Sequence, residues 1–233
     1  MIQVCALSVK HSPVVKLVNV WKSYGRTYVL KGISLSAYEK DFIVIRGKSG
    51  VGKTTLLKII GLLLKPCKGE VWINGMNTLN LSDKELSTLR LKTIGFIFQN
   101  FNLIPTLNTL ENIALPLILQ GLSRKKAFER SYNLLEEFNM ANLSHKYPYQ
   151  LSVGEQQRVA ILRAIVKNPK IILADEPTAN LDDENTEIVL ETLVSHVKHS
   201  KSLVIMTTTS AKEKPKNYPT VEYVLRNCML FRA

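Results

Sequence analysis

The stretch GKSGVGKTT at positions 47–55 carries the residues best suited to chemistry, and it follows directly after the apolar run 42–45. It fits the pattern G-x-x-x-x-G-K-[ST] from Gly47 to Thr54. Its glycines let the backbone turn with N–H groups pointing inward, so that a polyphosphate can be wrapped without collisions with Cβ atoms. Lys53 then provides a cation for the β- and γ-phosphates, and the Thr54 hydroxyl can hold Mg²⁺. The alternative is a glycine-rich turn that only caps a helix. The stretch predicts a nucleotide site made of Gly47, Lys48, Ser49, Gly50, Val51, Gly52, Lys53, Thr54 and Thr55.

Two adjacent acids, Asp175 and Glu176, end the mostly apolar run IILADE at positions 171–176. Parallel sheets open their ligand crevice at the carboxyl ends of the strands, so this pair can face the phosphate loop. Asp175 can orient Mg²⁺ through water, and Glu176 can polarise the attacking water as a general base. The alternative is an ordinary acid pair that opens a loop before Pro177. Beside a phosphate-binding loop, the pair favours hydrolysis of the nucleotide.

Short apolar runs and helical stretches must position these residues. Buried runs of four or five apolar residues, joined through helices, indicate a parallel sheet that is covered on both faces. From 107 to about 167 the pattern is mostly helical, which predicts an inserted helical subdomain. The patterns predict strands at 14–20, 33–38, 41–45, 70–73, 171–174, 203–206 and 221–225, and helices at 53–64, 83–91 and 184–199.

The composition narrows the class of protein. With 233 residues, 45% hydrophobic and 21% charged, the chain can bury a core, which excludes a disordered or collagen-like chain. No apolar run approaches the ~18 residues of a membrane span. The three cysteines, Cys5, Cys67 and Cys228, have no CxxC spacing, so neither a zinc site nor a disulfide framework is expected. A net charge of +12 could favour nucleic acid, but the basic residues are dispersed, which favours a solvated basic surface.

Further motifs carry a resemblance to ABC ATPases. The segment LSVGEQQR at 151–158 resembles their LSGGQ-type signature, and it opens an apolar helix. Gln99 lies where the family has its Q-loop, residues 179–182 resemble the D-loop, and Tyr24 stands where the family places an aromatic that stacks on adenine. The resemblance runs from about 15 to 225. Within the family, TLNTLENIALPL at 106–117 and the segment 151–164 look like the lipoprotein-release and macrolide-export branch.

The resemblance implies an α/β fold of the P-loop NTPase class. It implies one ATPase domain over 1–233, with a RecA-like parallel sheet core, an N-terminal antiparallel β subdomain and a helical signature subdomain inserted at about 100–167. The implied cofactors are ATP and Mg²⁺, with Thr54, Gln99 and Asp175 around the metal. Two nucleotide domains, identical or different, would meet head to tail. The free N–H groups at the start of the signature helix, with Ser152, Gly154 and Glu155, would then contact the γ-phosphate on the partner.

Two positions depart from the family pattern. Val153 replaces the second glycine of the signature and adds a β-branched side chain near the expected ATP contact. In SLVIMTTTS at 202–210, Thr208 or Thr209 takes the place of the histidine that normally ends the last strand. A threonine hydroxyl is short and carries no titratable ring. Loss of a group that positions transition-state charge commonly costs ~10²–10³ in rate, so we expect Thr208 to slow hydrolysis without abolishing it.

Three classes of function are compatible with these patterns. The first, implied by the resemblance, is an ATP-hydrolysing transport subunit that drives a separate membrane permease from the cytoplasmic, inner face of the membrane. Its direction would be export or release of lipoprotein or hydrophobic compounds. The second is a soluble ABC ATPase that acts on nucleic acid, although the tandem cassettes, coiled coil or zinc hook of such relatives are not visible here. The third is a nucleotide-sensing protein whose weak site gates an assembly.

Overall fold

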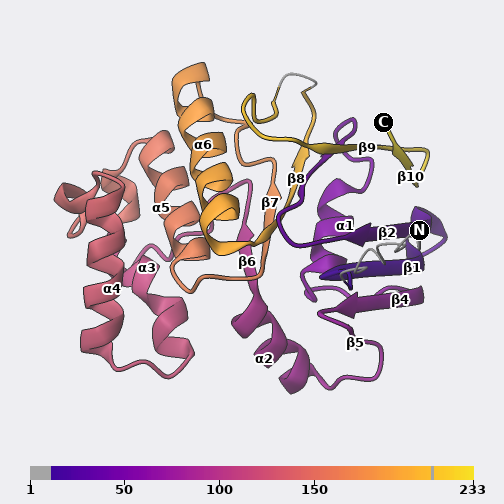
Figure 1. The fold of residues 1–233 in the computed structure, drawn as a ribbon, viewed down its shortest axis with the longest axis horizontal. Coiled ribbons are helices and arrows are strands. Elements are labelled where there is room, and N and C mark those ends of the chain that lie inside the picture. Colours follow the sequence, from indigo (N-terminus) through magenta and orange to yellow (C-terminus); the bar gives the residue numbers. More distant parts are fainter. Residues whose placement is uncertain (1–11, 211–212) are drawn as a thin grey trace, which may run out of the picture.

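A four-stranded antiparallel sheet forms one end of the molecule (Figure 1). The computed structural model describes residues 12–210 and 213–233, so Cys5 lies outside the described residues. The strand order is β2-β1-β4-β5, and β1 pairs antiparallel with both β2 and β4. The strands are β1 (Val15–Tyr24), β2 (Thr27–Ala37), β4 (Lys68–Ile73) and β5 (Met76–Asn77).

A second, six-stranded sheet runs through the centre of the molecule, in the order β10-β9-β3-β8-β7-β6. Its neighbouring strands are parallel except for the antiparallel pair β9 and β10. Register aligns Arg46 with Thr208 and Asp175 with Thr207, so three adjacent strands end at one edge. The strands are β3 (Phe42–Arg46), β6 (Ile94–Ile97), β7 (Ile171–Asp175), β8 (Leu203–Thr208), β9 (Val221–Arg226) and β10 (Met229–Arg232).

Helices other than α1, which follows Gly52, begin where polar side chains can satisfy their free N–H groups. Ser82, Asn108 and Ser152 each close a reciprocal capping box with a glutamate three residues later. Helices α3 and α4 lie together at one side of the molecule, next to α5 (Figure 1). The helices are α1 (Lys53–Ile60), α2 (Asp83–Thr93), α3 (Thr109–Leu119), α4 (Arg124–Glu137), α5 (Val153–Ile165) and α6 (Asp183–Ser200), with 3₁₀ turns at Ala141–Leu143 and Pro148–Gln150.

Side chains from the central sheet divide between two hydrophobic cores, one on each face. Along β3, Ile43 and Ile45 pack with α1 and the antiparallel sheet, whereas Phe42 and Val44 pack with α3, α5 and α6. Strand side chains alternate between faces. In β8 this alternation places Thr207 on the α1 face and Thr208 on the α6 face, following Ile205 and Met206 respectively.

The predicted fold class is confirmed: an antiparallel β part adjoins a mostly parallel sheet that is covered by helices. The division into an ATPase domain with an inserted helical subdomain at about 100–167 stays a prediction. Helix α1 ends at Ile60 rather than at 64, because Leu62 adopts a positive φ of 57° that a helix cannot continue through. Strands β5, β6 and β10 were not predicted, since they are short and lie at or near the sheet edges.

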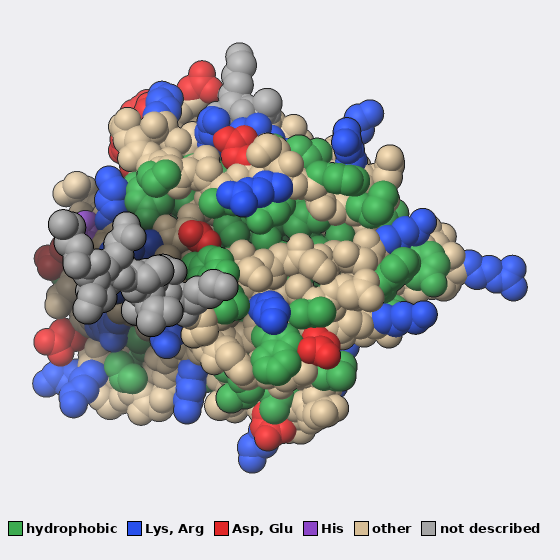
Figure 2. Space-filling model, turned by 45° about the vertical axis from the view of Figure 1, so that its right-hand side comes forward, with side chains coloured by type: hydrophobic (Ala, Val, Ile, Leu, Met, Phe, Trp, Pro, Cys, Tyr) green, Lys and Arg blue, Asp and Glu red, His purple; other side chains and the backbone are tan. Residues whose placement is uncertain are grey.

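Positive charge is dispersed over the face of the molecule that Figure 2 shows. On the face that Figure 2 shows, Lys and Arg side chains are scattered among hydrophobic, acidic and other polar ones, with no continuous basic stripe. Across the described residues, no helix has both the length and the apolar character to cross a membrane. Cys67 and Cys228 are free thiols.

Candidate nucleotide-binding site

The loop between β3 and α1 has a shape that demands glycine at three positions. Gly50 and Gly52 have φ of 75° and 112°, a region that L side chains rarely adopt. An added Cβ at Gly47 would lie 2.7 Å from the Leu225 carbonyl oxygen, and one at Gly52 would lie 2.8 Å from Val29 Cγ1. The bare backbone is therefore required by the loop's own geometry as well as by any phosphate it holds.

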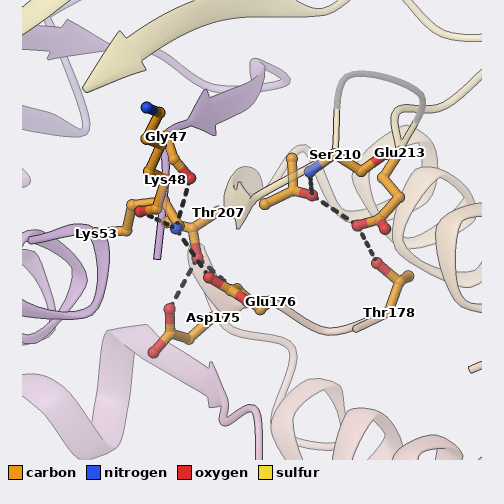
Figure 3. Close-up of polar contacts among 10 residues, drawn as sticks. Gly47, Lys48, Lys53, Asp175, Glu176, Thr178, Thr207, Ser210 and Glu213 are labelled. Atoms are coloured by element: carbon orange, nitrogen blue, oxygen red, sulfur yellow. Dashed lines mark hydrogen bonds and ion pairs between the residues drawn. The ribbon is translucent and has the colours of Figure 1, made fainter. Parts of the chain in front are cut away.

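The side chain of Lys53, the first residue of α1, curls back into this loop. Its Nζ donates to the carbonyl oxygens of Gly47 and Lys48, at 2.8 and 3.0 Å, and lies 2.9 Å from Glu176 Oε1 (Figure 3). Only 3% of the Lys53 side chain is exposed, so its charge is balanced at close range by the carboxylate. A polyphosphate that binds Lys53 must therefore compete with Glu176.

One threonine holds both acids of the predicted centre. Thr207 Oγ1 donates to Asp175 Oδ1 at 2.8 Å and accepts the Glu176 N–H at 3.1 Å. Asp175 is 4% exposed and Thr207 is fully buried. Glu176 adopts a positive φ of 45°, a conformation that is strained for glutamate and marks functional loops. Thr207 is not among the residues predicted from the sequence, where its signal was a threonine near the end of an apolar run.

Thr208, the other threonine at this edge, faces away from the phosphate loop. Its Oγ1 donates to Glu213 Oε2 at 2.6 Å and accepts the Ser210 N–H at 3.0 Å. Thr178 Oγ1 donates to the same glutamate oxygen at 2.7 Å (Figure 3). Among the described residues, no hydrogen bond joins the Thr208 side chain to Lys53 or Glu176. Thr208 is fully buried, whereas Thr209 is exposed. Glu213 is not among the residues predicted from the sequence.

The oxygen donors near the loop are suited to magnesium. Thr54 is exposed at the loop's end, and the Asp175 carboxylate lies at the end of β7, where it accepts a hydrogen bond from Thr207. Among the described residues there is no group of three or more His, Cys, Asp or Glu side chains that could hold a metal ion. Mg²⁺ usually keeps several waters and binds through one or two protein oxygens plus substrate phosphates. The donor set therefore fits magnesium that arrives with a nucleotide.

Gln99 lies exposed in the loop after β6, and a partly buried arginine fixes that loop. Arg163 of α5 donates to the carbonyl oxygens of Asn102 and Phe101, at 2.6 and 2.7 Å. Both of these loop residues have positive φ, 48° and 58°. Burial lowers the pKa of Arg163 to about 10. Arg163 thus ties the loop that carries Gln99 to the signature helix α5.

The start of α5 presents polar groups outward. Ser152 caps the helix, and its N–H donates to Glu155 Oε2 at 2.7 Å; this bond lowers the pKa of Glu155. Val153 is 47% exposed, so its branched side chain points to solvent and not into the core. Gly154 is buried, and a Cβ there would lie 2.7 Å from Asn185 Oδ1. Among the described residues, no hydrogen bond or ion pair joins Ser152 or Glu155 to the phosphate loop.

Tyr24, the residue predicted to stack on adenine, ends β1 with 54% of its surface exposed. Lys22 Nζ lies 5.7 Å from the centroid of its ring. The structure thus brings together the phosphate loop, Asp175 and Glu176. Within residues 12–210 and 213–233, no hydrogen bond connects Tyr24 or the start of α5 to that cluster.

Comparisons with known proteins agree with this arrangement. The model of the ABC transporter family matches residues 30–179. The lipoprotein-releasing system ATP-binding protein LolD of Aquifex aeolicus is 45% identical over 77% of this chain and 80% of its own. The dimeric ATP-binding cassette MJ0796 of Methanocaldococcus jannaschii, bound to ADP and phosphate after hydrolysis, superposes with a TM-score of 0.86 at 39% identity, covering 94% of this chain and 97% of the other. CbiO1 of Clostridium perfringens, part of the ABC transporter complex cbiONQ, superposes with a TM-score of 0.84 at 26% identity, covering 95% and 88%.

Proposed function

The chain belongs to the ABC transporter family of ATP-binding proteins, and from this premise we propose that it couples ATP hydrolysis to a separate membrane permease. As a member of this family it is an ABC ATPase. One observation carries the proposal: Lys53 and Glu176 lie 2.9 Å apart against the phosphate loop, with Thr207 fixing the acids. A cation for phosphate oxygens and a base for water are therefore adjacent.

The arrangement supports a simple sequence of events. The triphosphate of ATP binds Lys53, and this breaks the ion pair between Lys53 and Glu176. Thr207 still holds the Glu176 backbone N–H, so the released carboxylate stays at the sheet edge. Glu176 then takes a proton from a water molecule while that water attacks the γ-phosphorus, and ADP departs with the electrons of the broken P–O bond. Lys53 and the loop N–H groups stabilise the charge on the phosphate oxygens.

Magnesium that is bound with ATP would neutralise phosphate oxygens, and Thr54, Asp175 and Gln99 would hold it. Asp175 is already oriented for this role by the Thr207 hydroxyl. Gln99 is exposed on a loop that Arg163 ties to α5. A movement of this loop would therefore be transmitted to α5, and a movement of α5 to the loop.

We infer that a second cassette, either identical or related, completes each ATP site from across a head-to-tail interface. The ATP-binding cassette MJ0796 was solved as a dimer. Here Ser152 and Val153 are exposed at the start of α5, where free helix N–H groups suit a phosphate brought by a partner. Gly154 and Glu155 shape that helix end, and the exposed Tyr24 is available to the adenine of the chain's own ATP.

The permease would dock beside the Gln99 loop, and the chain would thus work as a peripheral protein on the cytoplasmic face of the membrane. Phe101, Leu103 and Ile104 are only partly buried there, and they form an apolar group that a membrane subunit can cover. The similarity to the lipoprotein-releasing ATPase supports export or release as the direction. A relative within the complex cbiONQ supports assembly with other subunits.

Hydrolysis is proposed to be slow. The Thr208 hydroxyl donates to Glu213, so it does not extend into the phosphate site as a longer, titratable side chain would. The same contact gives some support to an alternative, in which a slow ABC ATPase regulates an assembly without sustained turnover. A second alternative, action on nucleic acid, is opposed by the dispersed basic side chains (Figure 2).

A steady-state ATPase assay tests the proposal. Wild type should turn over ATP in the presence of magnesium, and Glu176→Gln should abolish turnover. Thr208→His should turn over ATP ~10-fold or more faster than Thr208→Val, a control that also lacks the hydrogen bond to Glu213. A Thr208→His variant no faster than an already brisk wild type contradicts slow hydrolysis. Co-purification in detergent should yield a membrane subunit that stimulates turnover; its absence supports the regulatory alternative. Nucleic acid binding with a steep salt dependence supports the other alternative.

A further inference from the structure

Glu213 is a carboxylate that the mechanism above does not use, yet it joins two loops at the edge of the ATP site. Its Oε2 accepts hydrogen bonds from Thr208 Oγ1 at 2.6 Å and Thr178 Oγ1 at 2.7 Å. Both threonines are buried, at 0% and 2% exposure. Two buried hydroxyls that donate to one carboxylate oxygen form a short, charge-assisted bridge.

The two threonines belong to the segments that set the position of Glu176. Thr178 lies two residues after Glu176, in the loop that leads to α6, and Thr208 ends the neighbouring strand β8. On its other side, Glu176 is tied by its own N–H to Thr207 of the same strand. The loop that carries the general base is thus fastened to β8 at two points, and Glu213 makes one of them.

Glu213 is held in place by anchors outside this bridge. Lys214 pairs with Glu222 of β9 at 2.6 Å, and Lys216 pairs with Glu187 of α6 at 2.9 Å. The Tyr218 hydroxyl donates to the Lys40 carbonyl oxygen at 2.7 Å. The segment 213–218 is therefore attached to β9, to α6 and to the turn before β3. This attachment brings the carboxylate to both threonines.

We propose that Glu213 is a positioning residue of the ATPase site, which holds the Glu176 loop to the end of β8 through Thr178 and Thr208. The proposal rests on the proposed function, because it concerns the same hydrolytic centre. The contact of Glu213 with the two threonines matters most after ATP has bound Lys53 and broken the ion pair between Lys53 and Glu176. The base has then lost its ion pair, and only the backbone anchors on either side keep its carboxylate in line with the attacking water.

Kinetics of matched variants test the role. Glu213→Ala should lower kcat by ~10-fold and leave the KM for ATP within about 2-fold, because the bridge holds the base and touches no nucleotide atom. Glu213→Gln should return kcat to within about 3-fold of wild type, since an amide oxygen still accepts from both hydroxyls. Thr178→Val should lower kcat to a similar extent, and combining it with Glu213→Ala should add little, as expected for one shared bridge.

Asp83→Asn serves as the control, because it breaks an exposed ion pair with Lys65 that takes no part in holding Glu213. Its kcat should equal that of wild type. The proposal is overturned if Glu213→Ala keeps the wild-type kcat, if its loss appears in KM instead, or if Gln fails to rescue it. A wild type that shows no ATP turnover overturns the proposed function and this inference with it. A wild type with turnover that is insensitive to Glu213→Ala overturns the inference alone.

Discussion

Replacing Thr207 by valine should remove the hydroxyl that bonds both Asp175 and Glu176, with little change in side-chain volume. Valine has nearly the volume of threonine but can neither donate to Asp175 nor accept the Glu176 N–H. Loss of a hydrogen bond to a charged, buried carboxylate costs about 1.5–3 kcal/mol, and a partly buried N–H left unpaired costs about 1–3 kcal/mol. With some relaxation and rescue by water, the free energy of unfolding should fall by about 2–4 kcal/mol.

Catalysis by Thr207→Val should suffer more than binding does. A displacement of the base by about 1 Å can cost ~10²-fold in rate, so kcat should fall 10- to 100-fold. Among the residues that the structure describes, no hydrogen bond joins the Thr207 hydroxyl to Lys53 or the phosphate loop, so the dissociation constant for ATP should change less than about 3-fold. Urea unfolding, steady-state ATPase assays and equilibrium nucleotide titration measure these three quantities.

Thr207→Ser is the matched control, because serine retains the hydroxyl that serves both acids. It should keep kcat within a few-fold of wild type and lose only about 1 kcal/mol of stability from the missing methyl group. Wild-type turnover in Thr207→Val, or equal losses in the serine and valine variants, would refute the idea that this hydroxyl fixes Asp175 and Glu176.

Three further changes have defined outcomes. Burial, together with the charge of His199, lowers the pKa of His196 from 6.5 to about 4. Between pH 6.5 and 4 the imidazole is therefore protonated in the unfolded chain but not in the folded one. The free energy of unfolding falls as the pH drops through that window. His196→Leu should therefore remove about 2 kcal/mol of acid destabilisation between pH 6.5 and 4, measured by urea unfolding at several pH values. Asn112→Leu should cost about 2–4 kcal/mol in the same assay, because the Asn112 amide holds the backbone at Ile104, Leu107 and Asn108 through four hydrogen bonds. Gly52→Ala should weaken ATP binding and stability more than a Gly50→Ala control. A Cβ at Gly52 would lie 2.8 Å from Val29 Cγ1, whereas one at Gly50 would have no neighbour within 4 Å. Equal effects of the two variants would contradict this reasoning.

Local sequence determined the parts of the site that lie within a few residues of one another. The phosphate loop is set by the run from Gly47 to Thr54 between a strand and a helix, and the structure has that strand, turn and helix. The acids Asp175 and Glu176 end a buried strand for the same local reason. Periodicity also located most core elements. It placed a strand at 14–20 but missed the end of β1 at 21–24, where register shifts between Val20 and Lys22 break the alternation that marks a strand.

Tertiary structure alone decided which groups serve the acids. Thr207 reaches Asp175 because β7 and β8 pair in a register that aligns them, and this register joins residues 32 positions apart. Glu213 reaches Thr178 across 35 positions because ion pairs fasten the segment 213–218 to β9 and α6. Such contacts depend on how distant elements pack. The sequence around a hydroxyl or a carboxylate does not indicate which distant residue it will bond. The sequence thus specified the groups that we propose to be catalytic, whereas their orientation came from the packing of neighbouring strands.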